Sequence, residues 1–441
     1  MSIPEALLLI SLRPSTGMVM LGICVVGFVW LCWLVAGGRK QIRNKAQAAD
    51  AALAAGNYAE AIRLCDVGLA TERKMRLRPD DITAVMLVIR SEASQKLGKN
   101  DEALEAAAYA FGCLCCVQTN CAQLAVLDRL GNLLVDVRQD QRAIPVLEAA
   151  VALGKETDHD VLRNSSRLQH LGLANLRLGA YQNAIAAFGH AIETVAKQLG
   201  PDHLELASPY INLGNSYKNL HKPDDSERCY SEALRIYESN HITDPVRRSI
   251  ALLNLGVACA ESGRPEEAER YYEQVLSIRL KEFGRNDWRV GNTYNNLAMS
   301  KLRARDFKTA EEYVQMALEI LDEQPEWLPQ ALETLSRIRE EQGRLEESLT
   351  AMVRAVQTLE SRQSPNLSEL AERLDRQAML AMRLGDSDQA SACRNRALQL
   401  RQAMAGAPGS DSEQTEQALG NLDQSLQQWL GHIRSGQGAA A

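Results

Sequence analysis

A unit of about 42 residues recurs along most of the chain, and this period constrains the fold more than any local motif does. One small residue marks the unit at nearly equal spacing. The marking residues are Ala61, Ala103, Ala143, Ala184, Ser226, Ala268, Ala310, Ser348 and Ala390. Self-similarity at such a period is typical of solenoids, in which each unit packs only on its neighbours. The sequence therefore predicts a repeat array.

The composition constrains both the core of such an array and the partners that it could bind. Apolar residues make up 46% of the 441 residues but aromatic residues only 5%, so small and aliphatic side chains must fill the core. The 49 basic and 56 acidic residues give a formal net charge of -7. Nucleic-acid binding usually requires a basic surface, so we expect no nucleic-acid partner.

Within each unit the apolar residues follow a helical period, most clearly in the fourth unit. Its pattern consists of Leu168, Leu171 and Gly172, then Gly179 and Tyr181, then Ala184, Phe188 and Ala191. A Gly inside a helix lets a neighbouring helix approach closely, and a Gly at the turn adopts a backbone conformation that is costly for other residues. Each unit is therefore predicted to be two helices joined by a turn, and the fold class to be all-α.

These residues resemble the tetratricopeptide repeat, which places a Leu-Gly pair and a Tyr in one helix before an Ala-x-x-x-Phe run in the next. The resemblance covers about nine repeats over 46–404. It is greatest to the longer repeats of kinesin light chains, because of linkers such as 199–203 and first helices such as 294–298. It implies a right-handed superhelical solenoid whose concave groove, lined by the first helices, binds extended peptides. It does not imply a motor, because we find no heptad segment to join a heavy chain.

Two irregularities interrupt the pattern. The terminal units lack the Leu-Gly pair, as caps of a solenoid often do, and carry Ala48-Ala49, Arg90-Ser91, Leu335-Ser336 and Gln377-Ala378 in its place. The step from Ala310 to Ser348, where Pro325 and Pro329 lie, is shorter than its neighbours by about one helical turn. It predicts a shortened helix end or linker.

The N-terminal region has a different character. Residues 18–36 contain no charge, and these 19 residues at about 1.5 Å each could cross a bilayer core of about 30 Å. Tryptophans lie toward the end of this stretch, and four basic residues follow it, against one basic residue before it. These residues are Trp30 and Trp33, then Arg39, Lys40, Arg43 and Lys45, with Arg13 upstream.

This pattern predicts a short segment 1–17, a transmembrane helix 18–38 and a basic juxtamembrane segment 39–45. The excess of basic charge after the span places the repeats in the cytoplasm, as part of a single-pass membrane protein. The alternative is a cleaved signal peptide with Val35 and Gly37 at its cleavage site. The basic cluster after the apolar stretch disfavours that alternative.

Three asparagines are the sharpest candidates for a binding site. Asn212, Asn254 and Asn296 occupy one equivalent place in three successive first helices, and we call them the amide row. An amide can both donate to and accept from a peptide backbone, so such a row could hold an extended peptide without reading its sequence. Kinesin light chains are similar here. The alternative is that these amides hydrogen bond between neighbouring helices and set the superhelix.

Further residues are expected around the amide row. Asn215, Lys218, Asn292 and Asn295 should face the groove, and Lys218 could receive an acidic group. The equivalent places in other units include Ile250, Leu253, Val257 and Met299. A peptide with both polar and apolar side chains therefore fits better than a bare carboxylate terminus. The alternative for Lys218 is a solvated surface side chain.

Catalysis and metal binding find no support. The seven His are scattered, and no glycine-rich loop is placed to cradle a phosphate, so we expect neither an enzyme nor a cofactor. Cys113, Cys115, Cys116 and Cys121 cluster without the C-x2-C spacing of zinc sites. We expect these thiols to be buried at a helix end, the alternative being a metal or redox site.

Two segments outside the regular pattern could also make contacts. Residues 73–78 are basic and could approach an anionic membrane or remain a solvated linker. The C-terminal part, 405–441, begins with a Gly-, Pro- and Ser-rich linker and continues as a predicted amphipathic helix. Its apolar residues are Leu419, Leu422, Leu426, Trp429, Leu430 and Ile433. This helix is expected to cap the last repeat, the alternatives being to enter the groove or bind a partner.

The sequence as a whole predicts a membrane-anchored repeat scaffold that binds other proteins, as extended peptides, on the cytoplasmic side. Two alternatives remain open at this point. The repeats could assemble with one another to organise a membrane patch, or the cysteine cluster could act as a sensor.

Overall fold

The computed structural model describes residues 36–75, 77, 80–113, 120–158, 160–240, 244–362, 366–406, 420 and 423–424. All regular elements in these residues are helical, which confirms the all-α prediction for this part of the chain. After a helix over 36–54, the elements are α3 (Tyr58–Lys74), α4 (Asp81–Lys96), α5 (Asn100–Cys113), α6 (Asn120–Asp136), α7 (Asp140–Thr157), α8 (Val161–Arg177), α9 (Tyr181–Leu199), η3 (Leu204–Leu206), α10 (Ala207–Asn219), α11 (Pro223–Ser239), α12 (Pro245–Glu261), α13 (Pro265–Phe283), α14 (Trp288–Arg303), α15 (Phe307–Leu321), α16 (Leu328–Glu341), α17 (Leu345–Glu360), α18 (Leu367–Arg383) and α19 (Ser387–Gly406).

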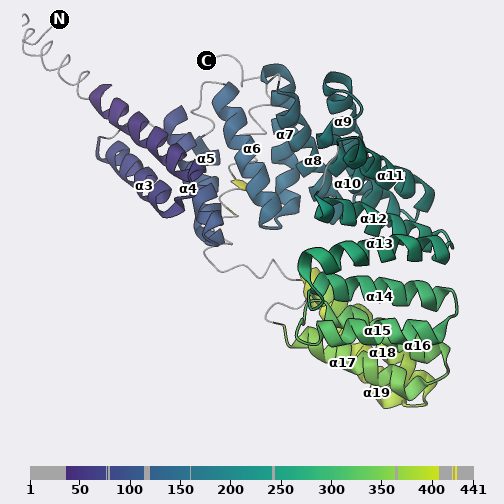
Figure 1. The fold of residues 1–441 in the computed structure, drawn as a ribbon. Coiled ribbons are helices and arrows are strands. Elements are labelled where there is room, and N and C mark those ends of the chain that lie inside the picture. Colours follow the sequence, from purple (N-terminus) through teal and green to yellow (C-terminus); the bar gives the residue numbers. More distant parts are fainter. Residues whose placement is uncertain are drawn as a thin grey trace, which may run out of the picture. The chain divides into compact units, whose positions relative to one another are not determined.

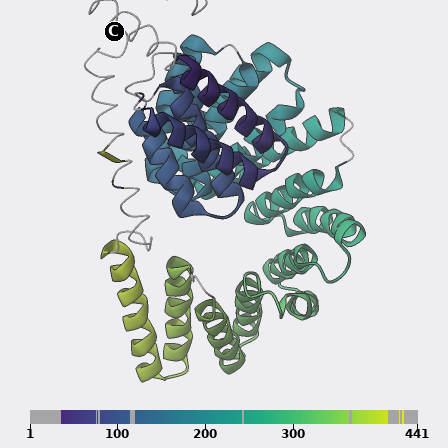
Figure 2. The ribbon, with the colours of Figure 1, turned by 90° about the vertical axis from the view of Figure 1, so that its left-hand side faces the viewer.

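The helices labelled in Figure 1 belong to two compact units. The first comprises residues 1–160 and 411–441 and contains the helices up to α7, whereas the second comprises 161–410 and contains α8 to α19. Within the second unit consecutive helices pair as hairpins, and each hairpin packs on the next (Figure 2). The repeats predicted as a single array over 46–404 are thus divided between two units.

The small residue that marks the repeat lies in the second helix of each hairpin and is buried throughout. The nine marking residues are 0 or 1% exposed. Where the residue is Ser, its hydroxyl donates to a backbone carbonyl: Ser226 to Pro223 and Ser348 to Ser336. The period in the sequence therefore reports the place where the second helix has no room for a larger side chain.

At the position of the Leu-Gly pair, a glycine in the first helix packs against a large side chain of the second helix in four repeats. The pairs are Gly131 with Leu147, Gly172 with Phe188, Gly214 with Tyr230 and Gly256 with Tyr272. A Cβ atom built on any of these glycines would lie 2.5 or 2.6 Å from its partner. The partners are at most 2% exposed, so the glycines are required by close packing of the two helices.

The turn between the two helices of each described hairpin contains one residue with positive φ. Six of the nine are glycines with φ between 75 and 84°, namely Gly56, Gly98, Gly179, Gly263, Gly343 and Gly385. The other three are Arg138, His221 and Arg305, with φ of 64, 55 and 60°. These three turns adopt the left-handed conformation without the residue that best tolerates it.

Replacing His221 by Gly is therefore expected to raise the free energy of unfolding by about 0.5–1 kcal/mol, because relief of the left-handed strain outweighs the greater freedom that Gly gives the unfolded chain. The reverse change, Gly263→His, provides the matched control and should lower stability by a similar amount. Urea unfolding followed by circular dichroism measures both, and a destabilised His221→Gly variant would contradict the assignment of strain.

The short step between Ala310 and Ser348 arises from shorter helices. α15 has 15 residues and α16 has 14, whereas α13 and α14, which span the preceding step from Ala268 to Ala310, have 19 and 16. A shortened helix end is thus confirmed, while the linker itself, 322–327, is not shorter than 284–287. Trp327 at the end of this linker stacks on Trp288, with ring centroids 4.2 Å apart.

The described part of the chain begins within the region predicted to be membrane-associated. Residues 18–35 of the predicted span lie outside the described residues. None of the helices that the structure describes combines the length and the apolar character that crossing a bilayer requires. The segment 39–45, predicted to precede the array, is instead part of the helix over 36–54, where Ile42 is only 4% exposed. An apolar residue within the basic run therefore packs this segment into the first hairpin.

Candidate functional site

The amide row lies on the first helices of three successive hairpins in the second unit. Asn212 is on α10, Asn254 on α12 and Asn296 on α14, and all three residues are half-buried. Two positions after each asparagine lies the residue that packs on the second helix of the same hairpin. These residues are Gly214, Gly256 and Ala298. Residues two apart on a helix point about 200° apart. The amides therefore face away from their own second helices.

The side-chain amides of the row are unpaired within the described part of the chain. Among the described residues, no hydrogen bond involves the side-chain amide of Asn212, Asn254 or Asn296, although the Ser216 hydroxyl donates to the backbone carbonyl of Asn212. The alternative in which they join neighbouring helices through hydrogen bonds is therefore not seen in these residues. Because the three residues are only half-buried, their donors and acceptors remain available to a ligand.

Of the polar residues expected around the amide row, Asn215 is hydrogen bonded and Asn295 is buried, whereas the other two are half-buried. Asn215 accepts a hydrogen bond of 2.9 Å from the Tyr230 hydroxyl, and burial raises the pKa of that tyrosine, so Asn215 supports the packing of its own hairpin. Asn295 is 2% exposed, and its Oδ1 atom finds no partner among the described residues, so it does not face outward as predicted. Asn292 and Lys218 are half-buried, and no ion pair to Lys218 is found in the described ranges.

Apolar side chains flank the amide on α12. Ile250, Asn254 and Val257 are spaced by four and three residues and therefore share one face of the helix. Ile250 is 42% exposed, and Val257 is half-buried against the core that contains Tyr272. On α14 the equivalent places hold Asn292, Asn296 and Met299, all half-buried. This surface therefore combines amides with apolar groups.

Two ion pairs in this part of the second unit join successive repeats. Arg264 pairs with Glu227, and Lys301 Nζ lies 2.7 Å from Glu269. The carboxylate of Glu269 raises the pKa of Lys301 by accepting its hydrogen bond. Pairs of this kind, which are partly exposed, contribute little to stability but hold neighbouring helices in register.

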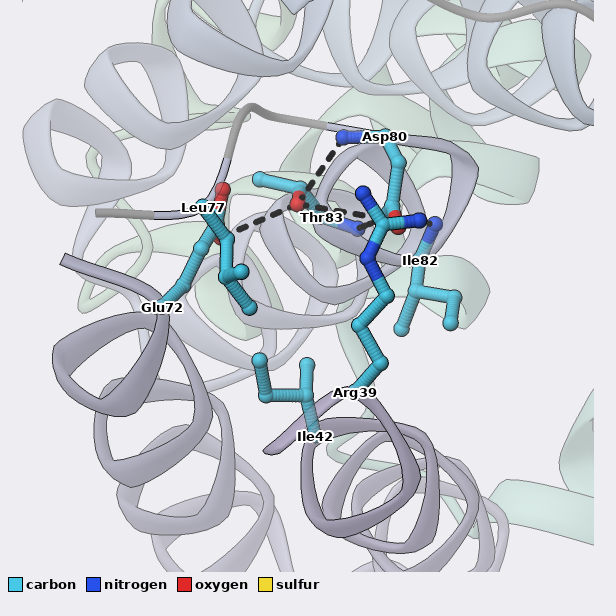
Figure 3. A pocket seen from close by; sticks show the side chains of 7 residues that line it. All are labelled: Arg39, Ile42, Glu72, Leu77, Asp80, Ile82 and Thr83. Atoms are coloured by element: carbon cyan, nitrogen blue, oxygen red, sulfur yellow. Dashed lines mark hydrogen bonds and ion pairs between the residues drawn. The ribbon is translucent and has the colours of Figure 1, made fainter. Parts of the chain in front are cut away.

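A small cavity in the first unit is lined by Arg39, Ile42, Glu72, Leu77, Asp80, Ile82 and Thr83 (Figure 3). Arg39 Nη1 lies 3.4 Å from Asp80, and the Thr83 hydroxyl donates to Glu72 Oε2 at 2.9 Å. Burial raises the pKa of Glu72. These groups satisfy one another and join the helix over 36–54 to α3 and α4. The cavity is therefore part of the packing of the first hairpins.

The described cysteines are buried thiols. Burial raises the pKa of Cys65 and Cys229 to about 12 and that of Cys259 to about 11, so they stay protonated at neutral pH. Cys113 is buried at the end of α5. Cys115, Cys116 and the side chain of Cys121 lie outside the described residues. In the described part of the chain, no group of three or more His, Cys, Asp or Glu could hold a metal ion.

Comparison with known proteins identifies the repeats. Residues 162–239, 247–323 and 289–361 match the family model of the tetratricopeptide repeat. A comparison with curated protein sequences finds no match.

Solved structures share the fold at low sequence identity. The apo form of RapI is 11% identical, with a TM-score of 0.60 over 82% of this chain and 98% of that one. The apo form of the quorum sensor NprR from B. thuringiensis is 14% identical, with a TM-score of 0.55 over 82% and 99%. The repeats of a putative kinesin light chain from Podosopora anserina are 19% identical, but with a TM-score of only 0.41 over 46% and 96%.

Proposed function

Since residues 162–239 and 247–361 are tetratricopeptide repeats, we propose that the chain is a scaffold that binds extended peptides of partner proteins along the amide row. The observation that carries the proposal is the set of three half-buried amides on α10, α12 and α14, which have no partner among the described residues. The proposal gives the chain no catalytic role, and neither a cofactor nor a nucleic acid as a partner.

The spacing of the first helices suits an extended peptide. α12 and α14 contact each other directly, and packed helices lie about 8–10 Å apart. An extended chain rises about 3.3 Å per residue, so the amides on α12 and α14 would meet the peptide backbone about three residues apart. Contacts to the backbone give affinity that depends little on sequence.

The surroundings of the amide row suggest which side chains the peptide carries. Ile250, Val257 and Met299 offer apolar contacts over α12 and α14, and Lys218 on α10 offers a positive charge. We therefore expect a peptide with an acidic group near one end and apolar residues beyond it. Such a pattern would make recognition selective although the amides alone read no sequence.

Anchoring in a membrane is the second part of the proposal. It is supported by the uncharged stretch 18–36 and by the basic residues that follow it, which favour a cytoplasmic position for the repeats. The repeats would then be presented close to the membrane surface.

Replacing Asn212, Asn254 and Asn296 together by Ala is expected to weaken peptide binding about a hundredfold, because each lost hydrogen bond costs about 1 kcal/mol and a factor of ten in affinity corresponds to about 1.4 kcal/mol. Peptides that bind the full-length wild-type protein in detergent would be selected from a random phage-displayed library. Their dissociation constants would then be measured for the wild type and for the triple variant. Circular dichroism should show unchanged helix content.

A matched control replaces three exposed polar residues on the second helices of the same repeats. Ser231, Gln274 and Gln315 are exposed on α11, α13 and α15, and their replacement by Ala should leave the affinity unchanged. Selected peptides that bind the amide-row variant as tightly as the wild type would show that the amides do not hold the ligand. A failure to select any peptide would count against peptide binding altogether.

A further inference from the structure

One charged residue occupies a place that is otherwise apolar between successive repeats of the second unit. This place lies eleven residues after the marking residue, near the end of the second helix, and is at most 6% exposed in five successive repeats. The residues there are Val195, Tyr237, Arg279, Leu321 and Leu359. Four of them belong to apolar clusters, whereas Arg279 brings a positive charge into the interface between α13 and α14.

The last repeat carries a charge at the same place under different conditions. Its equivalent residue, Arg401 of α19, is exposed and pairs with Asp375. The C-terminal helix predicted to cap this repeat lies outside the described residues except for 420 and 423–424. A positive charge at the end of α19 is therefore both hydrated and paired, whereas that of Arg279 is buried.

No carboxylate among the described residues pairs with Arg279. Its Nη1 donates to two neutral acceptors on α14, the Arg289 carbonyl at 2.8 Å and the Thr293 hydroxyl at 2.9 Å, and its buried Nε has no partner in the described ranges. Burial and the charge of Arg289 lower the pKa of Arg279 to about 10, so the residue stays charged at neutral pH. A buried charge without an opposite charge is costly. This interface is therefore held less strongly than the apolar one between α11 and α12.

An apolar cluster joins α13 and α14 at the other end of their interface. It contains Tyr272 and Leu297, which are 2 and 0% exposed. Beside Arg279, a further contact across the interface is that of the Arg289 guanidinium with the Phe283 ring, 4.2 Å from the ring centroid, and both side chains are half-buried. Separation of the two helices would therefore begin at the Arg279 end.

We propose that the interface between α13 and α14 is a hinge, which opens at the Arg279 end and pivots on the apolar cluster at the other end. The start of α14 moves with the repeats that follow it, because Trp288 stacks on Trp327 in the next linker. The hinge separates Asn254 on α12 from Asn296 on α14. A peptide bound to both would hold it closed; this consequence rests on the proposed function, whereas the hinge itself does not.

Hydrogen exchange of the full-length protein in detergent, read by mass spectrometry, tests the hinge without any ligand. Helices of this length depend on packing, so opening should speed exchange in 276–281 and 292–296. After correction for intrinsic rates, these segments should exchange about tenfold faster than the equivalent segments 234–239 and 250–254 of α11 and α12. Arg279→Leu, the residue type of the two following repeats, should slow their exchange about tenfold. The Arg289 carbonyl would still accept from the Thr293 hydroxyl, so this variant leaves that carbonyl paired.

A second variant balances the charge instead of removing it. Thr293→Asp places a carboxylate where the hydroxyl now accepts from Arg279, and it should also slow exchange about tenfold. In the double variant the new carboxylate is buried without a partner, so exchange should be faster than in either single variant. Arg270→Leu, the same change at an exposed residue of α13, is the control and should have no effect.

Three results would overturn the proposal. Equal protection of the two interfaces in the wild type would show that α13 and α14 do not separate preferentially. Exchange in Arg279→Leu as fast as in the wild type, or faster, would show that the charge does not weaken the interface. A double variant that exchanges as slowly as the single variants would show that charge balance does not control the opening. All three are read without a peptide, so none of them bears on binding at the amide row.

Discussion

Replacing Leu206 by Ala is expected to lower the free energy of unfolding of the second unit by about 2–5 kcal/mol, enough to remove much of the stability of a typical domain. Leu206 ends the short helix η3 in a linker between two repeats, yet it is completely buried. It packs in a cluster that includes Val195, Ile236 and Ala251. Truncation leaves a cavity among helices of successive repeats.

Leu199 provides the matched control for this variant. It ends α9 only a few residues earlier and is 41% exposed, so Leu199→Ala should change stability by less than about 0.5 kcal/mol. Urea unfolding of both variants, followed by circular dichroism, gives the two free energies. Equal effects of the two truncations would show that the linker does not anchor one repeat on the next.

Replacing Gly256 by Ala is expected to destabilise the second unit by about 1–2 kcal/mol, although the same change at Gly189 should stabilise it by up to about 1 kcal/mol. Both glycines lie inside helices, where Ala is intrinsically better by about 1 kcal/mol. At Gly256 the new Cβ would lie 2.5 Å from the Tyr272 ring, and overpacking typically costs about 1–3 kcal/mol. A Cβ atom built at Gly189 would have no atom of a neighbouring residue within 4 Å.

The following repeat suggests how the clash at Gly256 could be relieved. There the equivalent places hold Ala298 and Val314, which pack in one cluster. In a Tyr272→Val background, Gly256→Ala should therefore cost little or nothing further. The four free energies of this double-mutant cycle give the coupling directly. An unchanged cost of Gly256→Ala in that background would show that the ring is not what excludes the Cβ atom.

Local features with a fixed spacing could be predicted from the sequence. The repeat period identifies the buried small residues, the paired helices and most of the glycine turns, because each of these depends on residues close in the chain. The turns at Arg138, His221 and Arg305 could not be predicted, since nothing in their side chains indicates a left-handed backbone. There the repeat geometry imposes the conformation against the local preference.

Contacts between distant residues could not be predicted in the same way. Asn215 and Asn295 have the same amide as the residues of the amide row, but one is bonded to Tyr230 and the other is buried. Successive residues of a helix point about 100° apart, so these asparagines lie on different faces from the amide row. The spacing alone does not say which face packs against another helix. Arg142 forms an ion pair with Asp423, 281 residues away, and no repeat pattern in the sequence predicts this contact.

The buried cysteines give the molecule a set of built-in probes. Cys65, Cys113, Cys229, Cys259 and Cys393 lie in five different repeats, and all five are shielded from solvent. A protonated, shielded thiol reacts with an alkylating reagent only when its surroundings open. The labelling rate of each cysteine therefore reports the opening of its own repeat in the native protein, so that the order in which the repeats separate can be measured without altering the sequence.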